Sequence, residues 1–265
     1  MPSDPLGTTI EDVLASVFGA TPDTLFVVNP SVRVVEQYVA AASDEAGALP
    51  RTRLLADDGV LKGATADFLV ASPLAGLVAD DVLSLRTADD LPRASLLVTA
   101  DRVVSLVDLD DHTGGIATTD PGFVDDVLAA CERDWRDAAP YGLRTPPLAR
   151  VRETLADDLG DDVAADFDAL LAADDGLDEV EAALLAAAKN SVLLYDVSRW
   201  GEDVGLASKA TFSRTKTRLE DAGLLTTEKV PIDVGRPRLR LLLADDALTG
   251  ADAAALAETA RRALA

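Results

Sequence analysis

The sequence is poor in the side chains that most often carry enzymatic chemistry or hold metal ions. One cysteine, one histidine and one methionine occur among its 265 residues. The single cysteine, Cys131, excludes an intramolecular disulfide and a thiolate metal cluster. The chain also has no Gly-x-Ser-x-Gly turn and no Gly-x4-Gly-Lys phosphate loop, so no nucleophile and base pair is evident. We therefore predict no metal, no cofactor and no enzymatic activity.

Long apolar runs are also absent. No run reaches the roughly 18 apolar residues that a membrane span needs, and the first residues form neither a basic nor an apolar signal region. We therefore expect a cytoplasmic protein with no membrane partner. The apolar content of 48% is enough to form a core in one or two domains.

Lysine is scarce as well, since Lys62 is the only lysine before Lys189. Aspartate outnumbers glutamate by 36 to 11, and the net charge is −23. This composition is typical of a halophilic organism that keeps molar salt in its cytoplasm. Phosphate contacts weaken with salt by a log–log slope of about −0.9 per contact. A DNA-binding protein in such salt should therefore depend on shape, base contacts and dimerisation more than on the number of its charges.

Positive charge is concentrated in one part of this acidic chain. Residues 205–240 hold eight of the 24 basic side chains and only four of the 47 acidic ones. Such a polarised distribution indicates a nucleic-acid-binding patch.

The pattern around this patch predicts a winged helix-turn-helix domain over residues 178–265. Helices are expected at 178–189 and 192–200, with Gly201 and Gly205 in the turn, followed by a third helix that begins at the N-cap Ser208 and stops at Gly223. At 100° per residue, one face of the third helix points inward. That face consists of Phe212, Thr215, Leu219 and Ala222.

Two wing strands are expected at 224–231 and 238–243. Because strand side chains alternate, Arg236, Arg238 and Arg240 should share one face, while Leu239 and Leu241 return to the core. The Gly-Arg-Pro wing tip suits insertion of Arg236 into a narrow minor groove, and Arg238 suits a phosphate. A last helix at 251–264 suits packing or dimerisation.

The third helix is expected to enter the major groove with Arg214 as its main contact. Lys216 fits this face poorly and could lie at the edge of the core. The residues predicted to bind double-stranded DNA are Ser208, Lys209, Thr211, Ser213, Arg214, Lys216, Thr217, Arg218, Arg236, Arg238 and Arg240. The alternative is an ordinary surface helix beside an arginine-rich hairpin.

Residues 1–142 alternate apolar runs with amphipathic segments, which predicts an α/β domain for ligand sensing or dimerisation. Strands are expected at 25–28 and 68–70, each followed by a helix, at 32–42 and 74–78. A hairpin is expected at 95–99 and 103–107. A helix at 122–135 should bury one face, made of Phe123, Val127, Leu128 and Cys131. Prolines 140, 146 and 147 mark a boundary, and a helical connector with helices at 148–159 and 163–173 is expected over residues 143–177.

Both predicted strand-to-helix turns place polar groups at the carboxyl end of a strand, where open α/β sheets bind ligands. A phosphorylated sugar is the effector this suggests. The candidate ligand residues are Asn29, Ser31, Arg33, Arg53 and Ser72. The alternative is that Ser31 and Ser72 only cap helices.

The run at 208–224, with the segment 227–238 behind it, resembles the haloarchaeal TbsP transcriptional regulators, and the likeness extends over most of the chain. The resemblance implies an α/β domain ahead of a winged helix and a role in controlling sugar-metabolism genes, near the TrmB sugar sensors. We expect a homodimer that reads half-sites about one helical turn apart. One rival is a degenerate phospholipase-D-like hydrolase, although His112 is followed by Thr113 and Gly114 and not by the lysine that family needs. Another is a protein-interaction adaptor or small-ligand-binding protein.

Overall fold

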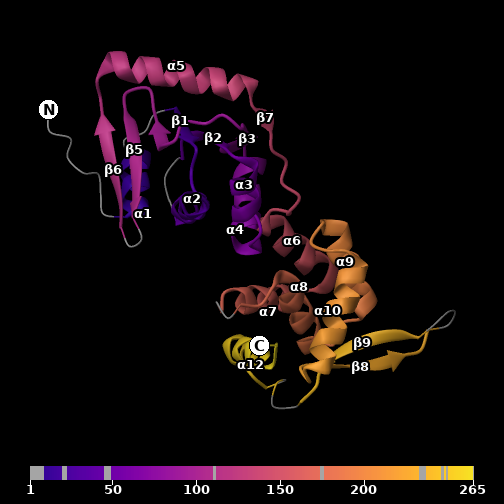
Figure 1. Cartoon of the computed structure of the whole chain (residues 1–265). Coiled ribbons are helices and arrows are strands. Elements are labelled where there is room, and N and C mark those ends of the chain that lie inside the picture. The colour runs from indigo at the N-terminus through magenta and orange to yellow at the C-terminus, as the bar shows by residue number, and fades with distance from the viewer. Residues whose placement is uncertain are drawn as a thin grey trace. The chain divides into compact units, whose positions relative to one another are not determined.

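The computed structural model describes residues 9–19, 23–44, 49–109, 112–173, 176–232, 237–245, 248 and 250–264 (Figure 1). The chain divides into two compact units, residues 1–143 and residues 144–265. Each unit has its own core.

The first unit is built on a seven-stranded mixed sheet with the order β6-β5-β4-β1-β2-β3-β7. The three strands β1, β2 and β3 are parallel, and the other neighbours are antiparallel. The strands are β1 (Thr24–Val28), β2 (Arg51–Ala56), β3 (Leu83–Thr87), β4 (Ser95–Val98), β5 (Val103–Leu109), β6 (His112–Thr118) and β7 (Ala139–Pro140).

Helices cover both faces of this sheet (Figure 1). Leu25 and Val27 of β1 pack with α1–α4, whereas Phe26 and Val28 pack on the other face with α5. Because both faces are buried, β1 is a continuous apolar run without polar alternation. The helices are α1 (Ile10–Gly19), α2 (Val32–Asp44), α3 (Asp58–Ala64), α4 (Phe68–Ala79) and α5 (Pro121–Asp137).

The strand predicted at 68–70 is wrong, because these residues form the first turn of α4. Asp67 is the N-cap, and its carboxylate accepts a hydrogen bond from the Leu69 amide at 2.8 Å. Ser72 is therefore buried inside a helix and does not cap one. The strand that follows β1 in the sheet is β2, which the apolar pattern did not reveal.

The predicted hairpin is confirmed as β4 and β5, and β6 extends it. The helix predicted at 122–135 is confirmed as α5, and three of its four predicted inward residues lie in the core or pack against it: Val127, Leu128 and Cys131. Phe123 is 52% exposed, and Val124 is buried in its place with Cys131 and Trp135.

The second unit is helical with a two-stranded wing (Figure 1). Its central helix is α8, in which every residue from 180 to 188 is buried; α7, α9, α10 and β9 pack around it. A helix that is apolar on all sides is stable only where other elements surround it. The elements are α6 (Leu148–Leu159), α7 (Asp161–Leu171), α8 (Glu179–Lys189), α9 (Leu194–Val204), α10 (Lys209–Asp221), β8 (Leu225–Val230), β9 (Arg238–Leu243) and α12 (Ala253–Leu264).

The predicted fold class, an α/β domain followed by an α+β winged helix-turn-helix, is confirmed. Helices α6 and α7 belong to the second unit, and α12 packs against α7. Within the described ranges no single helix is both long and apolar enough to cross a bilayer. Helices α3 and α4 together meet that length and composition, but they are bent by 112° at their junction.

Candidate nucleic-acid interface

Helix α10 begins at the predicted N-cap. The Ser208 hydroxyl accepts a hydrogen bond from the Thr211 amide at 3.2 Å. The predicted inward face is also observed, because Phe212 and Leu219 are fully buried and Thr215 is 8% exposed. The opposite face, which includes Ser213, is thereby directed to solvent.

Replacing Ser208 by alanine should lower the free energy of unfolding of residues 144–265 by about 1 kcal/mol, because the cap accepts an otherwise unpaired helix amide. Ser208→Asp keeps an acceptor at this position and should retain most of the stability. Urea unfolding followed by Trp200 fluorescence, in a Trp135→Phe background, measures both variants. Equal losses in the two variants would contradict a capping role.

The connection between α9 and α10 depends on two glycines, but not in the way predicted. Only Gly205 lies in the turn, where it adopts a left-handed φ of 87°. Gly201 lies inside α9, where a Cβ atom would stand 2.2 Å from Cε2 of Phe212. The missing side chain therefore lets α10 approach α9 closely.

The outward face of α10 carries hydroxyl groups around one arginine. Ser213, Arg214 and Thr217 are exposed. Arg214 Nη2 lies 3.4 Å from Thr211 Oγ1, and Thr217 donates a hydrogen bond to the Ser213 carbonyl oxygen. No acid pairs with Arg214 in the part of the chain that is described.

Two other basic residues of α10 are bound to acids of neighbouring helices. Lys209 Nζ lies 2.6 Å from Glu202 Oε2, and this hydrogen bond raises the pKa of Lys209 and lowers that of Glu202. Arg218 reaches back to α8, where Nη2 lies 2.5 Å from Glu181 Oε1 and 3.3 Å from Asp178 Oδ2. Arg218 thus connects the middle of α10 to the start of α8.

The acceptor of Arg218 is unusual because Glu181 is buried, with a side chain only 5% exposed. Its carboxylate also accepts a hydrogen bond from the Asp178 amide at 2.9 Å, which completes a capping box at the start of α8. Burial raises the pKa of Glu181, while the Asp178 amide and Arg218 oppose that rise. Arg218 therefore compensates a buried negative charge.

Lys216 does not lie on the outward face. Its side chain is 13% exposed and forms an ion pair with Glu220 one turn later. The position at the core edge agrees with its poor fit to the DNA-contacting pattern.

The wing presents two of the three predicted arginines, and Arg236 lies outside the described residues. The Arg238 guanidinium stands 4.2 Å from the centre of the Tyr195 ring and 3.6 Å from Asp196. Arg240 lies 3.3 Å from Glu228 on the opposite strand. Leu241 is fully buried, as the strand alternation predicted, whereas Leu239 is only half-buried.

A groove of about 380 Å³ lies between the starts of α9 and α10 and the wing. Tyr195, 45% exposed, and Ile232, 39% exposed, form apolar parts of its lining, and Lys209 and Arg238 supply positive charge. No local sequence pattern indicates Tyr195, since its proximity to Arg238 depends on the pairing of residues 192–193 with β9. The remaining lining residues are Leu194, Ser198, Ser213, Pro237 and Leu239.

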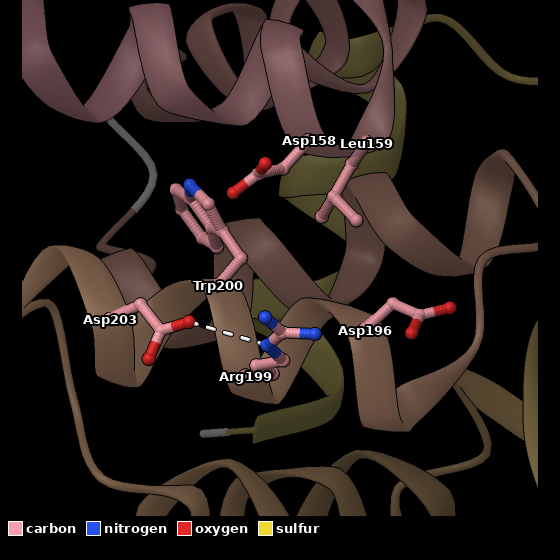
Figure 2. A pocket seen from close by; sticks show the side chains of 6 residues that line it. All are labelled: Asp158, Leu159, Asp196, Arg199, Trp200 and Asp203. Carbon is pink, nitrogen blue, oxygen red and sulfur yellow. Dashed lines mark hydrogen bonds and ion pairs between the residues drawn. The ribbon is translucent and has the colours of Figure 1, made fainter.

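A second hollow, at the end of α6 and along α9, has the opposite charge. Figure 2 shows Asp158 and Asp203 near Trp200, with Asp196 on the other side of Arg199, which pairs with Asp203 at 3.4 Å. Within the described ranges no group of three acidic, histidine or cysteine side chains could hold a metal ion. These carboxylates should repel phosphate, so they limit the extent of any DNA-binding surface.

The five ligand candidates of the first unit do not form one cluster. Ser31 caps α2, since its hydroxyl accepts from the Val34 amide at 3.3 Å. Asn29, with a φ of 49°, donates through Nδ2 to the Pro92 carbonyl at 2.8 Å. Arg33 is exposed on α2 near this end of β1. These residues remain at the carboxyl end of β1.

The other two candidates lie elsewhere. Ser72 is buried in α4, on the face of the sheet that α1–α4 cover. Arg53 lies on the α5 face, 5.4 Å from the Phe26 ring and 5.9 Å from the Trp135 ring. Cys131 is buried on the inward face of α5, and burial raises its pKa to about 11, so its thiol stays protonated near neutral pH.

Comparison with known proteins gives two family matches that together span almost the whole chain. Residues 2–146 match the model "Transcriptional regulator TbsP-like, N-terminal", and residues 147–261 match "Transcriptional regulator TbsP-like, C-terminal HTH domain". No curated protein matches the sequence.

Two solved structures are similar to parts of the chain. The archaeal chromatin protein TrmBL2 is 12% identical, with a TM-score of 0.35 over 51% of this chain and 52% of its own. The phospholipase D family member Nuc from Salmonella typhimurium is 10% identical, with a TM-score of 0.36 over 49% of this chain and 88% of its own.

Proposed function

Since the chain belongs to the TbsP-like family of transcriptional regulators, we propose that it is a homodimer that reads the major groove of double-stranded DNA with the outward face of α10. The observation that supports this most directly is the position of Arg214. It is exposed on a helix whose other face is anchored by Phe212 and Leu219. A family of regulators also agrees with the absence of enzymatic activity predicted from the sequence.

In this proposal the contacting residues have different tasks. Arg214 and Thr217 contact base edges, while Ser208 and Lys209 at the start of α10 contact phosphate. Arg238 and Arg240 contact the backbone from the wing, and Arg236 enters the minor groove. Thr211 and Ser213 complete the surface.

Arg218 and Lys216 have structural tasks instead. Each is held by an acid of its own unit, Arg218 by buried Glu181 and Lys216 by Glu220. Both were among the residues predicted to bind DNA, and we now assign them to the packing of α10.

We assign to the first unit the sensing of a metabolite, with a phosphorylated sugar as the effector and sugar-metabolism genes as the targets. The resemblance to TbsP regulators supports this assignment. The acidic composition supports operation at high salt, where dimerisation and shape compensate for weakened phosphate contacts.

Arg214→Ala should weaken DNA binding by about 5- to 150-fold, the loss expected when one bidentate base contact worth roughly 1–3 kcal/mol disappears. Fluorescence anisotropy in molar KCl, with fragmented genomic DNA of the source organism, measures the effect. Arg199→Ala is the matched control, because Arg199 is an exposed arginine beside the acidic hollow. Its affinity should equal that of the parent protein.

Equal weakening by both variants would show that charge alone matters and would contradict the assigned role of Arg214. Absence of binding by the parent protein would favour an adaptor that uses the winged helix against another protein.

A further inference from the structure

Three arginines lie on the α5 face of the sheet in the first unit. Arg51, Arg53 and Leu55 occupy alternate positions of β2 and therefore point to the same face of the sheet. Leu55 packs with α5, so this is the α5 face. Arg86 of β3 stands opposite Leu55 in the parallel register, and Ser84 stands opposite Arg53. The strand pattern therefore places the three cations and an exposed serine on one face of β2 and β3, with Arg53 and Ser84 between Arg51 and Arg86.

Two of these cations share a single indole ring. The guanidinium of Arg86 stands 4.9 Å from the centre of the Trp135 ring, and that of Arg53 stands 5.9 Å from it. Arg86 is held in place through Nη1, which donates to the Trp135 carbonyl at 2.7 Å and approaches the Ala138 carbonyl at 3.4 Å. Arg53 also stacks on Phe26. Both guanidinium groups are thus oriented by aromatic packing.

No carboxylate neutralises this cluster within the described residues. Neither Arg51 nor Arg53 makes an ion pair or a side-chain hydrogen bond there, and Arg86 bonds only to carbonyl groups. This unpaired positive charge contrasts with the composition of the first unit as a whole, in which residues 1–143 hold 24 acidic and only nine basic side chains. One third of the basic residues of this unit therefore lie together, although acids are abundant elsewhere.

We propose that Arg51, Arg53 and Arg86 form a binding site for a small phosphorylated ligand. Guanidinium groups match the geometry of phosphate oxygens through paired N–H donors, and a dianion relieves the repulsion between like charges. Ser84, which stands opposite Arg53 in the strand register and is exposed, offers a hydroxyl as a further donor. A polymer such as DNA fits this site poorly, since the surrounding unit is strongly acidic.

This inference rests on the sensing role proposed for the first unit and is independent of DNA binding by the second. It also places the ligand away from Asn29 and Ser31, on the other side of the sheet from Ser72. Among the ligand residues predicted from the sequence, it retains only Arg53.

Calorimetric titration with pyrophosphate, at constant ionic strength in KCl, tests the site. The parent protein should bind, and Arg51→Gln/Arg53→Met should bind at least about tenfold more weakly, the loss expected for charge-assisted contacts. Methionine keeps the apolar packing on Phe26 and Trp135. The matched control is Lys62→Gln/Arg133→Gln, which removes the same charge from exposed positions and should bind like the parent.

Arg51→Gln alone distinguishes loss of the binding site from misfolding. Arg51 is exposed, so its replacement should leave the fold intact and still weaken pyrophosphate binding. Absence of heat with the parent protein, or equal affinity in all variants, would overturn the site. DNA binding by Arg51→Gln/Arg53→Met should match the parent, so failure of this site is distinguishable from failure of the DNA-binding role.

Discussion

Replacing Phe212 by alanine should lower the free energy of unfolding of residues 144–265 by about 3–5 kcal/mol, as for other fully buried aromatic side chains. Phe212 is completely buried and joins α10 to α9 through its contact with Gly201. Urea unfolding followed by the fluorescence of Trp200, in a Trp135→Phe background, reports this unit alone. The unfolding of the first unit, followed by Trp135 in a Trp200→Phe background, should not change.

A double-mutant cycle isolates the contact itself. Gly201→Ala alone should cost about 1–3 kcal/mol, because its Cβ atom would overlap the Phe212 ring. In the Phe212→Ala background the same change has room, and it should be neutral or stabilise by up to about 1 kcal/mol, the helix preference of alanine over glycine. Additive effects of the two substitutions would show that α9 and α10 do not meet at this point.

Replacing Arg218 by alanine should destabilise the second unit by about 1.5–3 kcal/mol at neutral pH, the range for hydrogen bonds to charged groups. The effect arises because Glu181 remains buried without its cation. Arg152→Ala is the matched control, since Arg152 pairs with Asp168 at 2.6 Å with side chains 50% and 38% exposed. That change should cost less than about 1 kcal/mol.

The pH dependence of the Arg218→Ala defect has a definite sign. Burial already raises the pKa of Glu181 above its ordinary value, and loss of Arg218 should raise it further. A carboxyl group with a raised pKa in the folded state contributes stability below its unfolded pKa and loses it as the pH rises through the folded pKa. The deficit relative to the parent should therefore shrink as the pH falls through the pKa of Glu181.

A second substitution tests the cause. Glu181→Gln removes the negative charge and keeps an oxygen that can accept from the Asp178 amide. Arg218→Ala/Glu181→Gln should therefore be more stable at neutral pH than Arg218→Ala. If neither a lower pH nor Glu181→Gln reduces the loss of stability caused by Arg218→Ala, Arg218 stabilises α10 by packing alone.

The second unit follows its local sequence signals closely. Ser208 as N-cap, Gly223 at a left-handed φ of 72° after α10, and the inward position of Phe212 all follow from short-range rules. Such signals depend on only a few neighbouring residues. A single sequence therefore predicts these helices well, although it wrongly placed Gly201 in the turn and not inside α9.

The first unit shows where local signals fail. The apolar triplet 68–70 is too short to distinguish a buried strand from a helix, and Asp67 was the overlooked N-cap. The polar side chains of β2, among them Arg51 and Arg53, concealed a strand in the middle of the sheet. Partners remote in sequence, such as Glu181 for Arg218, depend on tertiary packing and left no local pattern.

Most basic side chains near the proposed DNA-binding face are already matched with a carboxylate, including Lys209, Arg238 and Arg240. A phosphate that approaches this surface must displace a resident acid before it gains a cation. With random DNA, a phosphate contact only replaces an existing ion pair, so little binding free energy is gained. An operator gains more, because its base edges also contact the protein. The protein should therefore leave unrelated sequences quickly and search a genome by frequent dissociation and rebinding, with long residence only at its own operators.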